Sequence, residues 1–355
     1  MKILKYFLYL ILIVIIGGAV YFGTQDGTFD IAETKFMDAN PAMIYENVND
    51  FKNWQEWGPW IEQDPNMELK YAENTVGEGA SYSWSSEVMG DGSMKTVKVV
   101  ENAEIDQTIT FNSPLGESTS DIYWRFNQKD NGTEVTWGMK GEHSLIEKAF
   151  MAFQSQSFEV ALNEMHKKGL ANLDSVIQTE MNKYTIDVQG IKQYGGGYYM
   201  YTTTACKQED IGSRMAPMMG KVHSFLQTNK IAITGMPFTI YNDWDEANGT
   251  VIFSAAIPVK EKIITTGGDV LCGYMEPLSA VKTVLKGNYN HLSKGYEKAQ
   301  QYIGENNLLI DPSKNMFEIY ANDPGDFPNP ADWTTEIYIP VFKDLTSNHP
   351  IINGN

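Results

Sequence analysis

Two stretches of the chain repeat one alternation of apolar and polar residues. Residues 238–241 and 317–320 both read Phe-x-Ile-Tyr, and each is followed by a loop and a strand-like run that closes on Ile-Pro-Val. Alternation at period two predicts β-strands. A helical pattern precedes each copy, and the two helices end at matching residues, Asn229 and Asn306. The repetition predicts a duplicated strand-helix-strand-strand unit that forms a pseudo-twofold antiparallel sheet with helices on one side.

The polar positions of the second copy suggest a binding surface. From the alternation we expect Glu318 and Tyr320 to share a face with Glu336 and Tyr338, opposite the face that packs on helices. Ser254 stands in the first copy where Glu336 stands in the second. We therefore expect a groove at the pseudo-twofold centre that is roomy on one side and anionic on the other. A carboxylate beside phenol rings suits a cationic or flat ligand.

Two aromatic residues of the first copy extend this candidate site, and a purely structural interpretation competes with it. Tyr241 ends the first Phe-x-Ile-Tyr segment, and Trp244 follows in a loop where it either closes the rim or covers the core. A solvent-exposed strand face would also account for Glu336, and an exposed partner of a neighbouring lysine would account for Glu318. No metal-ligand spacing, phosphate loop or nucleophile elbow is present, so the sequence predicts neither a metal nor a cofactor.

The N-terminal pattern predicts a membrane segment. Residues 6–22 contain no charge and follow Lys2 and Lys5. A helix of this length nearly crosses the roughly 30 Å hydrocarbon layer. Cleavable signals are usually shorter and end in small residues, whereas this run ends in bulky ones. We therefore expect an uncleaved anchor over residues 4–22, and the lysines predict that the rest of the chain lies on the extracytoplasmic side.

The segment after the anchor reads as an α+β domain. Asn40 and Pro41 are typical of the N-cap and first residue of a short helix. Strand-like runs follow at residues 79–87, 94–100, 108–111, 121–127 and 133–140. A single long helix is expected from residue 144 to about 181. Such a domain places one long helix across a curved antiparallel sheet.

Two family resemblances follow from these motifs. Residues of about 28–178 resemble the START/polyketide-cyclase (SRPBCC) superfamily of helix-grip domains, through Asn-Pro-Ala-Met-Ile-Tyr at 40–45, the Trp54 to Trp60 cluster and the order of elements. Residues of about 184–343 resemble the GyrI-like effector-binding domain of multidrug-responsive transcription regulators, through the duplicated unit. That resemblance implies a ligand in the central groove, faced by a glutamate at the position of Glu336. No helix-turn-helix segment precedes this domain, so transcriptional control is not implied.

The chain is therefore expected to be α+β and to contain an anchor (1–23), a helix-grip domain (24–181), a GyrI-like domain (184–343) and a tail (344–355). A net charge of −18 argues against a nucleic-acid partner, which needs clustered basic residues. The five histidines are scattered and read as surface or capping residues. Cys206 and Cys272 read as two buried thiols, although an oxidising compartment would allow them to pair.

Two classes of function remain open. In the first, the protein is a membrane-anchored module that binds an amphipathic or cationic small molecule in the GyrI-like groove, and an apolar ligand in the helix-grip cavity. In the second, it is a hydrolase or isomerase with Glu336 as general base. Binding is favoured because no nucleophile, metal or cofactor motif accompanies the glutamate.

Overall fold

The structure is a computed structural model that describes residues 2–113, 116–152, 157–265, 267–322 and 324–342. The expected tail, 344–355, lies outside the described residues. The chain divides into two compact units, Met1–Glu180 and Met181–Asn355. Each unit contains helices and an antiparallel sheet. The predicted α+β class is confirmed.

The first unit begins with the apolar helix α1 (Lys2–Gly23). The segment Ile3–Gly23 is long and apolar enough to cross a membrane, and none of it is buried. A signal sequence near the N-terminus meets the same criteria of length and composition. The predicted apolar helix at the N-terminus is confirmed, while its membrane role and its retention in the mature protein stay predictions.

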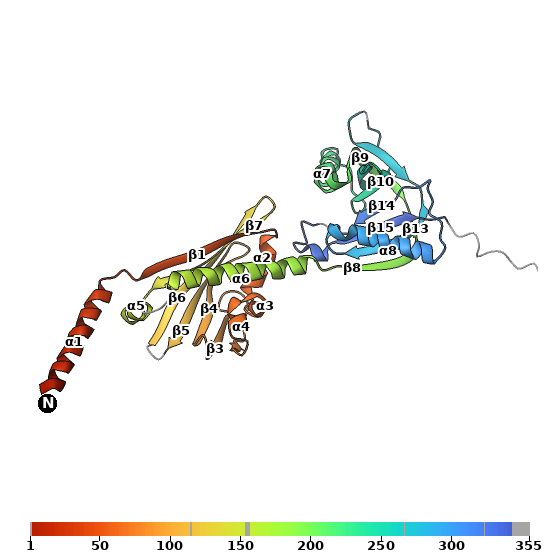
Figure 1. The fold of residues 1–355 in the computed structure, drawn as a ribbon. Coiled ribbons are helices and arrows are strands. Elements are labelled where there is room, and N and C mark those ends of the chain that lie inside the picture. The colour runs from red at the N-terminus through yellow and green to blue at the C-terminus, as the bar shows by residue number, and fades with distance from the viewer. Residues whose placement is uncertain (1, 114–115, 153–156, 266, 323, 343–355) are drawn as a thin grey trace, which may run out of the picture. The chain divides into compact units, whose positions relative to one another are not determined.

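A seven-stranded sheet forms the body of the first unit, in the order β1-β7-β6-β5-β4-β3-β2. Its strands are β1 (Thr28–Met37), β2 (Glu68–Tyr71), β3 (Ser81–Ser85), β4 (Asp91–Val100), β5 (Glu104–Ser113), β6 (Gly116–Lys129) and β7 (Gly132–Glu142). Its further helices are α2 (Pro41–Asn49), α3 (Trp54–Trp57), α4 (Pro59–Gln63), α5 (Leu145–Met151) and α6 (Phe158–Met181). The Asn40 side chain caps α2, accepting from the backbone N–H of Ala42 at 3.0 Å. The long helix α6 runs along the sheet (Figure 1).

The single helix expected over residues 144–181 is two helices. Ser144 and Glu147 form a capping box that starts α5. A second start follows at Ser157, whose hydroxyl accepts from the backbone N–H of Val160 at 3.3 Å. Residues 153–156, between the two helices, lie outside the described residues.

Aromatic rings occupy the interior of the first unit. Trp57, Trp124 and Trp137 are almost fully buried, and the last two stack with ring centroids 4.6 Å apart. His166, on α6, is fully buried, and its ring centroid lies 4.5 Å from that of Trp137. The expectation of a surface or capping role is therefore wrong for this histidine. Neither of its ring nitrogens has a hydrogen-bond partner, and burial lowers its pKa to about 4. An apolar ligand inside this domain stays a prediction.

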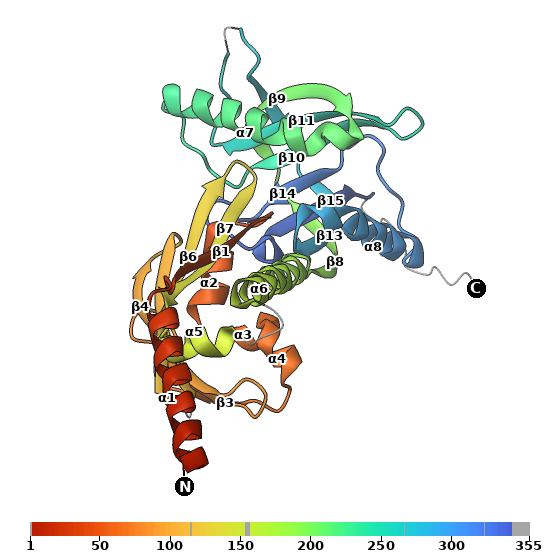
Figure 2. The same ribbon diagram turned by 60° about the vertical axis from the view of Figure 1, so that its left-hand side comes forward.

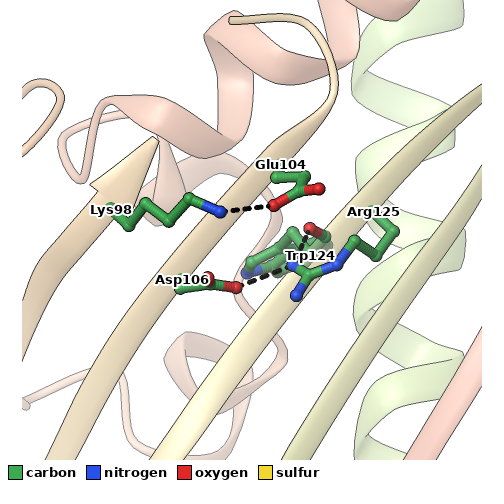
Figure 3. Close-up of polar contacts among 5 residues, drawn as sticks. All are labelled: Lys98, Glu104, Asp106, Trp124 and Arg125. Carbon is green, nitrogen blue, oxygen red and sulfur yellow. Dashed lines mark hydrogen bonds and ion pairs between the residues drawn. The ribbon is translucent and has the colours of Figure 1, made fainter. Parts of the chain in front are cut away.

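The outer face of the same sheet carries charged pairs instead (Figure 3). Lys98 pairs with Glu104 at 2.9 Å, and Arg125 pairs with Asp106 at 2.7 Å. Arg125 also donates to the backbone carbonyl of Trp124 at 2.7 Å. Successive residues of a strand point to opposite faces, so Trp124 enters the core while Arg125 stays outside. The Lys98–Glu104 pair is the more exposed of the two, and exposed pairs stabilise a fold by about 0–1 kcal/mol each.

The second unit contains an eight-stranded sheet in the order β12-β9-β11-β10-β14-β15-β13-β8. Its strands are β8 (Thr185–Tyr194), β9 (Gly197–Lys207), β10 (Phe238–Asp245), β11 (Thr250–Val259), β12 (Leu271–Met275), β13 (Leu278–Lys286), β14 (Phe317–Tyr320) and β15 (Thr334–Pro340). Its two long helices are α7 (Ile211–Thr228) and α8 (Leu292–Glu305). The series β9, α7, β10, β11 recurs as β13, α8, β14, β15, so the strand order is symmetric about its centre (Figure 2). The predicted duplication is confirmed.

Matching contacts support the pseudo-twofold relation. The Asn229 side chain donates to the carbonyl of Phe225 at 2.8 Å, and the Asn306 side chain donates to that of Tyr302 at the same distance. The two copies meet where β10 pairs with β14, and the short strands there place Thr239 opposite Glu318. Those two residues are equivalent in the repeat, so the symmetry centre passes between them.

Candidate functional site

The two faces of the second sheet are chemically different, and the register assigns each carboxylate to one of them. Glu318 pairs with Ile337, while Ile319 pairs with Glu336. Directly paired residues lie on the same face. Ile337 packs among residues of α8, such as Ala299, so Glu318 lies on the helix side. Glu336 lies on the opposite side, and the expectation that the two glutamates share one face is wrong.

Glu336 is partnered within the protein. Its carboxylate lies 2.8 Å from the ammonium of Lys282 and accepts from the phenol of Tyr338 at 2.8 Å. The Lys282 ammonium also lies 5.6 Å from the centroid of the Tyr338 ring. Ser254, expected opposite Glu336, is buried and hydrogen-bonded to two neighbouring side chains. None of these residues lines the groove described next.

A groove of about 1570 Å³ lies on the helix side of the sheet. Strands β10 and β14 contribute aromatic residues and Glu318 to its lining, α7 contributes apolar residues, and α8 contributes both apolar and polar ones. Its lining includes four of the predicted site residues, namely Glu318, Tyr320, Tyr241 and Trp244. The structure therefore brings together one carboxylate and two phenols from the predicted set, together with the indole of Trp244, which is 43% exposed. Trp244 lies within β10, so the expectation that it stands in a loop is wrong.

Glu318 is the buried anion of this groove. It is 1% exposed. One carboxylate oxygen, Oε1, accepts from Tyr296 at 2.9 Å and from Tyr241 at 3.0 Å. The other, Oε2, has a single long contact of 3.4 Å with the phenol of Tyr320. Among the described residues, none of the ion pairs includes Glu318.

Burial and hydrogen bonding act against each other at Glu318. Burial raises its pKa, because the charged form loses hydration, and the three phenols oppose this rise by donating to the carboxylate. Burial also raises the pKa of Tyr241, Tyr296 and Tyr320 well above the usual value, and the charge of Glu318 adds to that rise. The phenols therefore remain protonated donors, and Oε2 retains most of its capacity to accept from a ligand.

The pseudo-twofold symmetry of the sheet explains why Tyr241 and Tyr320 both lie close to Glu318. Tyr241 and Tyr320 are equivalent residues of the repeated Phe-x-Ile-Tyr segment, and the variable position is Thr239 in one copy and Glu318 in the other. The hydroxyl of Thr239 lies 2.9 Å from the phenol oxygen of Tyr320. The symmetry thus gathers both tyrosines around a centre that carries a single carboxylate.

Tyr296 is a functional candidate that the sequence reasoning missed. Tyr296 occupies an apolar position of the helical pattern before the second copy, and Met219 occupies the matching position before the first copy. The replacement of a thioether by a phenol at equivalent positions was the available signal. Met219 itself lines the groove from α7.

The remaining charged residues of the groove are acidic. Glu246, Glu297 and Asp326 belong to its lining, and all three are exposed. No lysine, arginine or histidine occurs among the described residues that line it. The groove is therefore anionic at its mouth as well as at its buried carboxylate.

Neither a protein-family model nor a curated protein matches the chain. Among solved structures, the EcmrR C-terminal domain has 19% identity, covers 45% of this chain and 98% of its own, and has a TM-score of 0.39. An EcmrR–DNA complex has 16% identity, coverages of 61% and 88%, and a TM-score of 0.39. The Aha1 dimer from Colwellia psychrerythraea has 16% identity, coverages of 42% and 95%, and a TM-score of 0.31. At these scores the similarities assign neither a family nor an activity.

Proposed function

We propose that the second unit binds an amphipathic organic cation in the groove, with Glu318 as the counter-charge. The observation that carries this proposal is a carboxylate that is 1% exposed and has no cationic partner among the described residues. An ionised carboxylate without a cation is costly to bury. A ligand that brings a positive charge removes that cost, whereas a neutral ligand of the same shape does not.

The groove also suits the apolar part of such a ligand. Met215 and Met219 line it from α7, and methionine side chains adapt their shape to ligands of different outline. Trp244 and Phe327, which are 43% and 40% exposed, lie in the same lining. Aromatic faces near a cation contribute about 0.5–2 kcal/mol, depending on desolvation. The methionine and aromatic side chains of the lining together favour a cation that carries an aromatic ring system.

Titration with a matched pair of probes tests this function. We suggest 1-methyl-4-phenylpyridinium and its neutral isostere 4-methylbiphenyl, added to the full chain and followed by tryptophan fluorescence. The cation is expected to bind at least ten times more tightly. Its affinity should fall as the pH is lowered through the raised pKa of Glu318, because protons then compete for the carboxylate. Equal affinity for both probes would contradict the proposal.

Turnover is the alternative that the same titration leaves open. The base expected from the sequence, Glu336, is paired with Lys282 and does not line the groove. A carboxylate with a raised pKa, such as Glu318, is nevertheless suited to proton transfer. A time course with excess probe and substoichiometric protein separates the two: unchanged probe supports binding alone, and product formation supports an enzyme.

We further propose that α1 holds the protein at a membrane. Tyrosines occupy both ends of the helix, at Tyr6, Tyr9 and Tyr21, where the interfaces of a bilayer would lie. The lysines before the apolar run favour an extracytoplasmic location for both units. Intact-mass analysis of membrane-derived protein tests retention of the helix: an N-terminus near Gly23 would contradict it. Protection of both units from external protease in intact cells would contradict the orientation.

A further inference from the structure

The short helix α5 exposes its apolar residues. Leu145, Ile146 and Phe150 are 43%, 50% and 60% exposed. The polar residues of the same helix, Glu147 and Lys148, are only partly exposed. A surface helix of a water-soluble domain places its apolar face on the core and its polar face in water. In α5 this arrangement is reversed.

Contacts fix α5 beside the end of the apolar helix α1. The Lys148 ammonium donates to the backbone carbonyl of Gln25 at 2.7 Å. A side-chain carbon of Leu145, Cδ1, lies 3.7 Å from the point where a Cβ on Gly23 would stand. Gly23 is the last residue of α1. The apolar face of α5 therefore lies next to the C-terminal end of α1.

We propose that Leu145, Ile146 and Phe150 insert into the surface of the bilayer that α1 crosses. This inference rests on the proposed anchoring by α1. If α1 spans the hydrocarbon layer, Gly23 lies at its boundary, and a side chain in contact with Gly23 lies at nearly the same depth. Apolar and aromatic side chains on one face of a short amphipathic helix bind at that depth by burying apolar area.

The exposed side chains of α5 favour a contact with lipid that does not depend on the charge of the headgroups. The three exposed side chains are apolar, and the chain carries a net charge of −18, which disfavours attraction to anionic headgroups. Zwitterionic phosphatidylcholine should therefore suffice, at low and high salt alike. Because α5 follows β7 and precedes α6, the insertion would give the first unit a second attachment and fix its orientation on the membrane.

Site-directed spin labelling of the full chain in phosphatidylcholine vesicles tests this proposal. In a background with Cys206 and Cys272 changed to serine, nitroxides are attached at Ile146→Cys and, separately, at Phe150→Cys. Ile13→Cys on α1 reports the anchor. Val100→Cys is the aqueous control, since Val100 is 42% exposed and ends β4, which β5 and β6 separate from β7, the strand that leads into α5.

Collisions with oxygen, which partitions into lipid, and with a water-soluble nickel chelate give the depth of each label. We expect an oxygen-to-nickel ratio several times higher at positions 13, 146 and 150 than at position 100, independent of salt. If position 13 lies in lipid while 146 and 150 match position 100, the docking is wrong and the anchor stands. If position 13 also lies in water, both proposals are wrong. Dipolar coupling between 146 labels that disappears on dilution with unlabelled protein would show that a second copy covers this face, which also overturns the proposal.

Discussion

The buried histidine of the first unit makes acid stability a direct test of how that unit is packed. His166 is fully buried against Trp137, both of its ring nitrogens lack partners, and burial lowers its pKa to about 4. In the unfolded chain the pKa of histidine is about 6.5. The unfolded state therefore binds a proton at a higher pH than the folded state does.

The sign and size of the effect follow from linkage. A group whose pKa is depressed in the folded state contributes stability that is present above pH 6.5 and is lost as the pH falls towards 4. The full difference between the two pKa values corresponds to about 3 kcal/mol, of which about 2 kcal/mol is lost by pH 5. Other groups with shifted pKa values, such as His143 and Glu318, also contribute to the pH dependence, so the contribution of His166 is obtained as a difference between variants.

Replacing His166 with leucine removes this proton site and leaves an apolar side chain of similar volume. Urea unfolding at pH 7 and pH 5, followed by tryptophan fluorescence, measures the change, because six of the eight tryptophans lie in the first unit. Wild type and the control His223→Leu, at an exposed position on α7, should lose about 2 kcal/mol more than His166→Leu between the two pH values. Equal losses in all three proteins would refute the assignment of a buried neutral imidazole.

Three further predictions concern the site and the organisation of the chain. Tyr296→Phe removes a hydrogen-bond donor to Glu318, which raises the pKa of Glu318 further. Cation affinity should therefore fall severalfold, and the pH at which binding is lost should rise. An unchanged pH profile in the same titration would contradict this. Lys282→Met leaves Glu336 half-buried without a cation, and the second unit should lose about 1–2 kcal/mol in chemical unfolding, which Glu336→Gln in the same chain should restore. Residues 26–181 and 183–355, expressed separately, should each melt cooperatively in calorimetry; a fragment without a cooperative transition would place the domain boundary elsewhere.

The duplicated unit could be predicted from the sequence because its signals are local. The repeated Phe-x-Ile-Tyr and Ile-Pro-Val segments identify equivalent strands, and Asn229 and Asn306 identify equivalent helix ends. Such features do not depend on how the strands pair. They were sufficient to predict the strand-helix-strand-strand order and the symmetric sheet.

Alternation alone could not show which of the two glutamates faces the groove. Alternation places Glu318 and Tyr320 on one face of β14, and Glu336 and Tyr338 on one face of β15, but pairing between the strands decides which faces coincide. Both faces of β15 are buried, since Ile337 packs towards α8 and Tyr338 packs on the other side. The sequence of β15 therefore does not distinguish a polar face from an apolar one, and the register between β14 and β15 follows only from the three-dimensional structure.

His166 shows a different limit of the sequence reasoning. It stands four residues after Leu162 and four before Leu170, and all three are buried on one stripe of α6. The spacing was present in the sequence, but histidine is more common at surfaces than in apolar cores. The general preference of the residue type outweighed the local pattern, and the expectation failed at this position.

The most direct test of the central claim compares Glu318 with Glu336, which the sequence analysis placed in the same groove. Glu318→Gln preserves the shape of the groove and removes its buried charge, while Glu336→Gln removes a charge on the opposite face of the sheet. A charge-assisted contact contributes about 1.5–3 kcal/mol, so affinity for 1-methyl-4-phenylpyridinium should fall about ten- to a hundredfold in Glu318→Gln. Affinity for 4-methylbiphenyl should stay constant in both variants, and Glu336→Gln should bind the cation as wild type does. Loss of cation binding in Glu336→Gln but not in Glu318→Gln would contradict the account.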